Sequence, residues 1–382
     1  VQYRVKIVGR PVQGFESIGP DATVVLVMNH RSNMDVLLAN YLTSRHSTLS
    51  HAAGEWARTW PLHHIVRLAG NYVIDRDAND PLYRVLLRRY LEMAVTHGIN
   101  VAVFPEGELT RDGKLQAPQF GLLNYFATAQ WPGQDRDIVF IPTSFNYDRI
   151  PEQDQLVLGN EESFRERGHW YLVWSAIRFT CKYLLMPLLP REKRYGYACA
   201  SFGEPVSLKA WESANHISLK KLSAERRREY IEILGLQLMD RVEEGIPVMP
   251  SHMLATAMLR CGAQAVDRVS LLGSYQEVAG ALEITGAPIF TYEREQDQAF
   301  DLAVQTLVNA GALTVWDSGN VELVEGKRAL VQYYANSIAG YLRADFESES
   351  DHNGLHWEHA ALDNYMAVYA ESYERITHSE TT

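Results

Sequence analysis

The chain has 382 residues, of which 46% are hydrophobic and 22% charged, and its formal net charge is −11. This composition predicts a folded protein with a sizeable core and room for two or three domains. The acidic balance argues against a general nucleic-acid binder, which would need a basic face. The three cysteines lie far apart and form no metal or redox pattern, which indicates a reducing compartment: Cys181, Cys199 and Cys261. Because the chain begins at Val1 and not at a methionine, we expect its natural N-terminus to lie upstream. Whether that upstream part contains a targeting or membrane segment stays an open question.

Residues 24–28 are five consecutive apolar residues, a pattern typical of a fully buried strand. His30 and Asp35 follow directly, and apolar residues then recur at helical spacing, so the pair lies where a strand turns into a helix. α/β folds place their chemistry at such carboxyl ends of strands. A carboxylate one helical turn away can hold a neutral imidazole in one tautomer and stabilise its charged form, as a general base requires. The alternative is that Asp35 is only a helix cap.

The first 250 residues alternate between predicted strands and helices. An entry strand with a polar loop covers residues 1–19, and further strands are predicted over residues 68–76, 100–104, 138–146 and 197–208. Helices are predicted over residues 46–67, 82–97, 119–130 and 220–244. The alternation predicts an α/β fold with a mostly parallel sheet covered by helices.

The predicted helix over residues 46–67 contains four histidines: His46, His51, His63 and His64. No two of them have the i, i+4 spacing of a helical zinc pair, and no carboxylate pattern completes a site. We therefore expect no metal, and interpret these histidines as polar residues of an amphipathic helix.

The strand over residues 100–104 ends in a loop with the ingredients of an anion site: Gly107, Thr110, Arg111, Gly113 and Lys114. Backbone N–H groups can approach an anion closely at glycine, and two cations can neutralise a phosphate. The loop is not a Walker A motif, because Leu115 stands where serine or threonine is required. An ordinary polar surface turn is the alternative.

Residues 170–190 are apolar and aromatic, with Arg178 and Lys182 as their only charges. Two central cations argue against a membrane-spanning helix. Tryptophans, tyrosines and a basic pair on one face favour a helix that lies in the membrane interface. The alternative is an amphipathic helix that closes the core.

Proline and glycine residues near position 245 mark a boundary between an N-terminal α/β domain over residues 1–245 and a mainly helical C-terminal domain over residues 246–382. A hairpin predicted over residues 312–324 gives this domain a winged-helix character. Between Arg268 and Arg328 there are four basic and nine acidic residues, so the domain lacks the cations that DNA phosphates require. We therefore predict a packing or interaction domain, followed by a last helix and polar tail over residues 347–382.

Four blocks at the predicted strand ends give a resemblance: NHRSNMD (29–35), GNYVIDR (70–76), FPEGELTRDGK (104–114) and FIPTSFNYDRIPE (140–152). In this order they resemble the glycerolipid acyltransferase family, and four ordered blocks are far more specific than one. Within it the chain looks most like the glycerol-3-phosphate acyltransferases, on three further segments: FGEPVSL (202–208), IPVMPSHMLATAML (246–259) and LVQYYANSI (330–338). The resemblance implies the glycerolipid acyltransferase fold.

Two departures from that branch concern the acceptor. Its third block usually reads EGxRSR, whereas here Leu109 takes the first arginine position and Thr110 the serine position. Its second block usually has two arginines, whereas here Asp75 precedes Arg76. The segments IDR (74–76) and FPEG (104–107) are closer to the lysophosphatidate acyltransferase branch.

The resemblance implies that His30 is the general base that deprotonates the acceptor hydroxyl, and that Asp35 orients it. It implies that Arg76 and Arg111 bind the acceptor phosphate, joined by Arg31 and Lys114, since a guanidinium gives a bidentate phosphate contact. Glu106, Gly107 and Thr110 would shape the acceptor site, with a helix cap as the alternative for Glu106. No G-x-S-x-G elbow exists, so direct transfer is expected instead of a serine acyl-enzyme.

The resemblance thus implies transfer of a fatty acyl group from acyl-CoA or acyl-carrier protein to glycerol 3-phosphate, without a cofactor, at the cytoplasmic face of a membrane. The partners expected are these substrates and a membrane surface, and no nucleic acid. Two alternatives stay open. One is the same chemistry on 1-acylglycerol 3-phosphate or dihydroxyacetone phosphate. The other is an inactive scaffold protein that keeps the fold.

Overall fold

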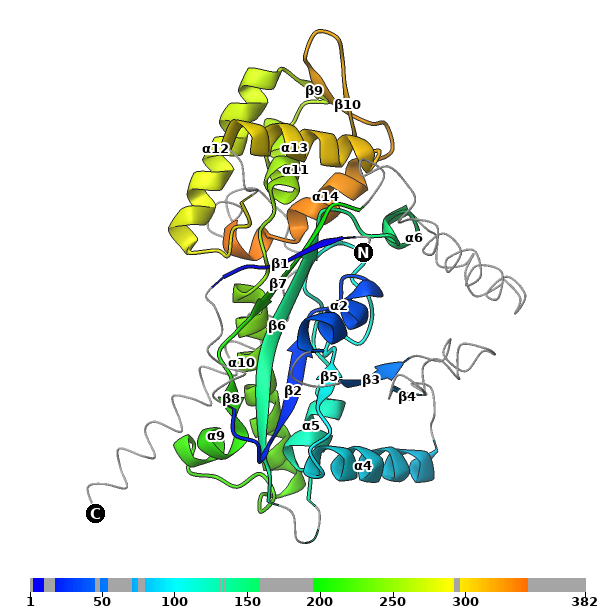
Figure 1. The fold of residues 1–382 in the computed structure, drawn as a ribbon, viewed down its shortest axis with the longest axis vertical. Coiled ribbons are helices and arrows are strands. Elements are labelled where there is room, and N and C mark those ends of the chain that lie inside the picture. Colours follow the sequence, from blue (N-terminus) through cyan, green and yellow to red (C-terminus); the bar gives the residue numbers. More distant parts are fainter. Residues whose placement is uncertain are drawn as a thin grey trace, which may run out of the picture.

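The computed structural model describes residues 3–9, 18–44, 49–53, 71–74, 80–130, 132, 135–158, 195–291 and 296–342. Figure 1 shows a long twisted sheet with helices on both faces and a helical region at one end. The strands of the main sheet are β1 (Arg4–Ile7), β2 (Ala22–Met28), β3 (Ser50–Ala53), β4 (Tyr72–Val73), β5 (Val101–Val103), β6 (Asp137–Tyr147), β7 (Tyr197–Phe202) and β8 (Val206–Ser207). The helices around it are α2 (Met34–Thr43), α4 (Pro81–Thr96), α5 (Gly121–Ala127), α6 (Gln153–Leu158), α9 (Leu208–Ala214) and α10 (Ala224–Glu244).

The strand order is β1-β7-β6-β2-β5-β3-β4, with β8 added on β6. From β6 to β4 each neighbouring pair is parallel, whereas β7 and β8 run antiparallel to β6. The predicted α/β fold with a mostly parallel sheet is therefore confirmed. Parallel order brings the carboxyl ends of β2 and β5 to one edge, where the first and third sequence blocks begin.

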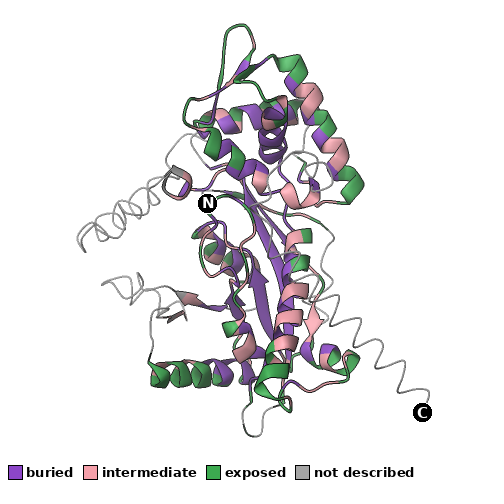
Figure 2. Ribbon diagram, turned by 180° about the vertical axis from the view of Figure 1, so that it is seen from behind, coloured by how far each residue is buried: buried purple, intermediate pink, exposed green. Residues whose placement is uncertain are grey.

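Both faces of the sheet are buried, as Figure 2 shows for the strands. Successive side chains of β2 alternate between two cores, because a strand directs neighbouring residues to opposite faces. Leu26 and Met28 belong to the core that contains α2, whereas Val25 and Val27 belong to the core built by α4, α5 and α10. β2 therefore consists of apolar residues almost throughout, as the sequence pattern predicted.

The C-terminal region contains α11 (Pro250–Cys261), α12 (Arg268–Thr285), α13 (Gln296–Asn309), α14 (Arg328–Asn336) and the 3-10 helix η4 (Ala339–Leu342). A small sheet of β9 (Ala265–Val266), β10 (Leu313–Val315) and β11 (Val321–Leu323) accompanies them, and β10 with β11 is the predicted hairpin. The core on the α2 face of the main sheet continues without a break into α11, α12, α13 and α14. The division into two domains after residue 245 stays a prediction.

One predicted helix is wrong in part. Within the stretch 46–67, residues Ser50–Ala53 form β3, which pairs with β5 on one side and β4 on the other. These backbone partners are supplied by distant strands, so tertiary pairing overrides the local pattern. His51, interpreted above as a polar residue of a helix, is instead buried on this strand. Residues 54–67 and the predicted helices over 170–190 and 347–382 lie outside the described residues.

Candidate active site

The chain leaves the sheet at Asn29, directly after β2. Met28 is still paired with Thr143 of β6. The side chain of Asn29 then replaces the strand backbone: its Nδ2 donates to the Phe145 carbonyl at 3.0 Å, and its Oδ1 accepts from the Phe145 N–H at 2.8 Å. Because the side chain makes these bonds, the backbone can turn away without leaving the buried groups of β6 unpaired. His30 is therefore the first residue beyond the edge of the sheet.

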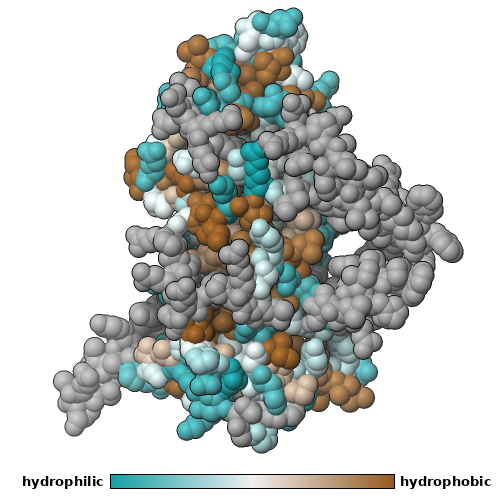
Figure 3. All heavy atoms as spheres, viewed as in Figure 1, coloured by the Kyte–Doolittle hydropathy of each residue, from teal (hydrophilic) through white to brown (hydrophobic). Residues whose placement is uncertain are grey.

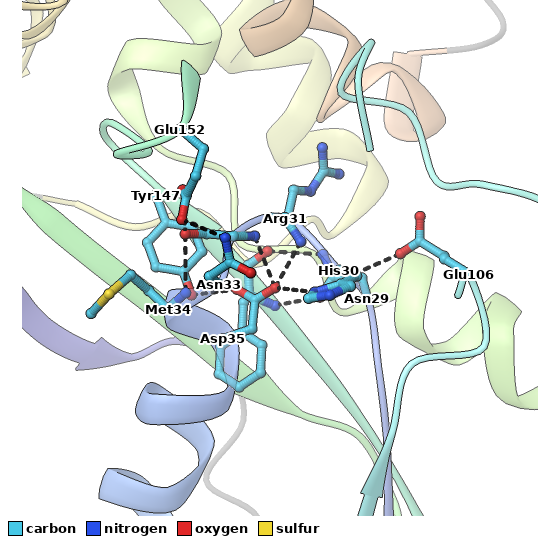
Figure 4. Close-up of polar contacts among 11 residues, drawn as sticks. Asn29, His30, Arg31, Asn33, Met34, Asp35, Glu106, Tyr147 and Glu152 are labelled. Carbon is cyan, nitrogen blue, oxygen red and sulfur yellow. Dashed lines mark hydrogen bonds and ion pairs between the residues drawn. The ribbon is translucent and has the colours of Figure 1, made fainter. Parts of the chain in front are cut away.

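The structure brings His30 and Asp35 together (Figure 4). Asp35 lies in the first turn of α2 and is fully buried, and its Oδ2 is 3.0 Å from His30 Nδ1. The same oxygen accepts from the backbone N–H groups of Arg31 at 2.7 Å and Ser32 at 3.0 Å. A carboxylate only accepts, so Nδ1 carries the proton and Nε2 keeps a lone pair. The His30 side chain is 15% exposed, which leaves the imidazole accessible to a reactant.

Glu106 connects the third sequence block to the first. Its Oε1 accepts from the His30 backbone N–H at 2.7 Å and its Oε2 from the Gln116 N–H at 2.8 Å. Burial raises the pKa of Glu106 to about 7, against the effect of these two hydrogen bonds. The ring of Phe104 stacks on the His30 ring, with 4.0 Å between centroids. Glu106 therefore positions the backbone of the histidine, and it does not act as a helix cap.

Thr110 is buried inside the third-block loop. Its backbone N–H donates to the His30 carbonyl at 3.1 Å, which joins the loop to the first-block turn. Its hydroxyl donates to the Lys114 carbonyl at 2.7 Å and accepts from the Gly113 N–H at 3.1 Å. These bonds give Thr110 a role in shaping the loop. Arg111 and Lys114 are exposed on the same loop.

Arg31 is buried, with 2% of its surface exposed. Its guanidinium donates to the Gly113 carbonyl and, at 3.4 Å, to the Ser337 carbonyl. From the C-terminal region, Asn336 donates through Nδ2 to the Asp112 carbonyl at 2.8 Å. Arg31 was predicted to bind substrate, but in this structure its contacts tie the loop to the end of α14.

Two side chains of the fourth block support the first-block turn, and the sequence patterns assigned them no role. The hydroxyl of Tyr147 donates to Asp35 Oδ1 at 2.5 Å. Glu152 accepts from the Ser32 hydroxyl at 2.9 Å and from Asn33 Nδ2 at 3.0 Å, and burial raises its pKa. Both residues lie inside the quoted block FIPTSFNYDRIPE, which was the available signal.

Two further residues bear on the site. Arg76 lies outside the described residues, so its phosphate-binding role stays a prediction. His51 on β3 is close enough to His30 for their charges to interact: burial first, and then His30, lower the pKa of His51 to about 4. His51 is therefore neutral at neutral pH.

Among the described residues, no group of three His, Cys, Asp or Glu side chains could hold a metal ion.

The geometry defines a strand-end histidine with a protonated Nδ1, held by a buried carboxylate and facing a loop that exposes two cations. This arrangement can remove a proton from a hydroxyl group whose parent molecule carries an anion.

Two family models match consecutive parts of the chain. The acyltransferase model matches residues 10–146, and the model of the glycerol-3-phosphate acyltransferase C-terminal region matches residues 189–342. Together they cover most of the chain, including the first-block turn, the third-block loop and α14. The chain belongs to the acyltransferase family, in its glycerol-3-phosphate acyltransferase branch.

Individual proteins agree with this placement. A glycerol-3-phosphate acyltransferase of Haemophilus influenzae is 25% identical over 327 residues, which are 82% of this chain and 39% of that protein. The glycerol-3-phosphate acyltransferase of Aeromonas hydrophila is 26% identical over 330 residues, with the same shares. The chain therefore spans well under half the length of these relatives. The crystal structure of the 1-acyl-sn-glycerophosphate acyltransferase PlsC from Thermotoga maritima aligns with 62% of this chain and 72% of the PlsC chain, at 18% sequence identity. Its TM-score of 0.35 is too low to add to the fold assignment.

Proposed function

We propose that this protein transfers a fatty acyl group from acyl-CoA or acyl-carrier protein to the hydroxyl of glycerol 3-phosphate, a step of phospholipid biosynthesis. The observation that carries the proposal is the 3.0 Å contact between His30 Nδ1 and the buried Asp35 carboxylate. The two family models and the names of the relatives support the substrate class.

In the proposed reaction, Nε2 of His30 takes the proton of the acceptor hydroxyl as its oxygen attacks the thioester carbonyl carbon. Asp35 stabilises the imidazolium that forms. The tetrahedral intermediate collapses, the carbon–sulfur bond breaks, and the imidazolium returns the proton to the leaving thiolate. Nothing is oxidised or reduced, so the step needs no redox cofactor.

Arg111 is the described residue that we propose as a ligand of the acceptor phosphate, together with Arg76. Its neighbour Thr110 bonds to the His30 carbonyl, which supports a position close to the base. Lys114 is exposed on the same loop and adds a second cation. For Arg31, Glu106, Gly107 and Thr110 we propose an indirect role, in which they hold this loop against the first-block turn.

A panel of acceptors with one labelled acyl-CoA, repeated with acyl-carrier protein, tests the proposal. Glycerol 3-phosphate should give the highest kcat/KM. The segments IDR (74–76) and FPEG (104–107) make 1-acylglycerol 3-phosphate the second candidate, and dihydroxyacetone phosphate completes the panel. Leu109→Arg should lower the KM for glycerol 3-phosphate if the site is the one proposed. Absence of transfer to every acceptor would favour an inactive scaffold.

We further propose peripheral association with the cytoplasmic face of a membrane. α4 supports this: it buries Leu91 and Val95 on one side and exposes apolar side chains elsewhere, namely Leu82, Val85, Leu86, Tyr90 and Met93. Apolar surface is visible at the lower right of Figure 3, where Figure 1 draws α4. No helix among the described residues is long and apolar enough to cross a membrane. Co-sedimentation with anionic vesicles tests the association, and Leu82→Ser with Leu86→Ser should weaken it.

A further inference from the structure

Tyr147 is the last residue of β6 and lies beyond the end of β2, level with the turn that carries His30 and Asp35. β2 ends at Met28, which pairs with Thr143, whereas β6 continues to Tyr147 alongside β7. The ring of Tyr147 belongs to the same core as Leu38 of α2. The alternation of side chains along β6 therefore directs Tyr147 toward the helix that Asp35 begins.

The two oxygens of the Asp35 carboxylate have different partners (Figure 4). Oδ2 holds His30 Nδ1 and the backbone N–H groups of Arg31 and Ser32. Oδ1 accepts from the Tyr147 hydroxyl at 2.5 Å. Asp35 is 0% exposed and Tyr147 is 1% exposed, so water does not compete for this bond. The turn itself thus supplies the donors on one oxygen, and the sheet supplies the donor on the other.

The hydroxyl of Tyr147 is a donor at every working pH, because burial and the adjacent Asp35 carboxylate raise the pKa of Tyr147 well above its ordinary value. A buried carboxylate stays ionised only when hydrogen-bond donors replace the water that it has lost. Hydrogen bonds to an ionised acceptor are stronger than neutral ones and favour the charged form. A donor on Oδ1 also fixes the rotation of the carboxylate, so that Oδ2 stays aimed at the imidazole.

We propose that Tyr147 is a positioning residue for acyl transfer, acting through Asp35 on the orientation and basicity of His30. The inference rests on the proposed function, in which His30 is the general base. Tyr147 contacts no substrate in this role. The other titratable or charged groups near the pair belong to several elements: Tyr3, Arg31, His51, Glu106, Glu152, His252 and Tyr333.

The test is Tyr147→Phe, which keeps the ring that packs on Tyr3 at 5.3 Å between centroids and removes only the hydroxyl. The matched control is Tyr334→Phe, an equally buried tyrosine whose hydroxyl bonds to Gln153 at 2.9 Å instead of to the pair. Tyr147→Phe should lower kcat about 10- to 100-fold, the usual effect of losing a hydrogen bond to a charged group. The KM values for both substrates should change little, because the residue touches neither.

The pH profile separates positioning from packing. Without the hydroxyl, the ionised carboxylate is less stabilised, so the His30–Asp35 pair binds protons more readily and the acid limb of kcat/KM moves to higher pH. Replacing Tyr147 with 3-fluorotyrosine, a stronger donor of almost the same shape, should move that limb to lower pH. This second variant keeps the test valid if Tyr147→Phe folds poorly. Proton NMR of the hydrogen-bonded His30 Nδ1–H adds a readout that does not require turnover.

The outcomes distinguish this inference from the function on which it rests. If the wild-type protein transfers no acyl group to any acceptor, the proposed function fails, and the NMR signal still tests whether Tyr147 positions the pair. If His30→Ala abolishes transfer while Tyr147→Phe keeps the wild-type kcat, acid limb and Nδ1–H resonance, the positioning role is overturned. Equal losses of kcat in Tyr147→Phe and Tyr334→Phe, with the acid limb unshifted in both variants, would also overturn it, since the effect would then be packing.

Discussion

Two segments meet at the carboxyl edge of the sheet and differ in what holds them. The first-block turn over residues 29–35 is supported from inside the molecule, by β6 and by the start of α2. The third-block loop over residues 104–114 is held by the backbone of His30 and by the end of α14, and it exposes Arg111 and Lys114. The hydrogen bonds that orient the proposed base are therefore complete within the sheet and α2, whereas the proposed phosphate loop also depends on the C-terminal region.

The largest expected effect is that of His30→Ala. General-base catalysis contributes about 10²–10⁴ in rate, so kcat should fall by that factor while the KM of the acceptor changes little. Steady-state kinetics with glycerol 3-phosphate measure both constants. His97→Ala, at the exposed end of α4, is the control. A His30→Ala variant that keeps more than a tenth of the activity would remove the first-block turn from the chemistry.

Arg111→Ala should act on the other segment. Losing a charged hydrogen bond to phosphate costs about 1.5–3 kcal/mol, so the KM of the acceptor should rise about 10- to 100-fold. The KM of the acyl donor should stay nearly constant, because ground-state binding of only one substrate is lost. Arg84→Ala on the exposed side of α4 controls for the loss of a surface cation. If Arg111→Ala instead raised only the KM of the acyl donor, the acceptor phosphate would have to bind at another site.

Gly113→Ala tests whether α14 supports the loop. Gly113 has φ +84, and an added Cβ would lie 2.0 Å from the Tyr333 carbonyl oxygen of α14, so loop and helix must separate. We expect the KM of the acceptor to rise about tenfold and stability to fall by about 1–3 kcal/mol, measured by urea unfolding.

The matched control is Gly319→Ala, in the β10–β11 hairpin. Gly319 has the same φ of +84 but no neighbour within 4 Å of the added Cβ. It should show the backbone strain without any change in KM. Equal kinetics in the two variants would mean that contact with α14 does not matter for the loop.

The smallest effect on rate is expected for Glu106→Gln, at the contact between the two segments. Burial raises the pKa of Glu106 from an ordinary 4.5 to about 7, so the folded state holds a proton that the unfolded chain releases. Wild-type stability should therefore fall as pH rises from 4.5 through 7. The Glu106→Gln variant has no such proton to lose, so its stability lacks this pH dependence. Between pH 5 and 8 its free energy of unfolding should therefore rise by roughly 1–3 kcal/mol relative to that of the wild type. Glu108→Gln, exposed on the same loop, is the matched control for the loss of a carboxylate.

Local pattern was sufficient for several features. The apolar run before Asn29, the close spacing of His30 and Asp35, and helical periodicity after them predicted a strand-end pair, and the structure contains it. Backbone geometry over a few residues decides such contacts, so no distant partner had to be known. β3 shows the opposite case, because a four-residue strand with small and polar side chains has no pattern of its own and exists through its pairing with β4 and β5.

Apolar runs and periodicity along the chain were thus enough to predict the alternation of strands and helices, the order of the four blocks, and the strand-end position of His30 and Asp35. The side chains that support this pair come from distant parts of the chain. Tyr147 reaches Asp35 across 112 residues, and Arg31 reaches the Ser337 carbonyl across 306. These contacts depend on how far β6 extends past β2 and on where α14 packs, which follow from sheet register and core packing and leave no periodic trace in the chain. That is why the sequence could not show that Arg31, a phosphate ligand by the resemblance, is buried and donates to the Gly113 carbonyl of the loop.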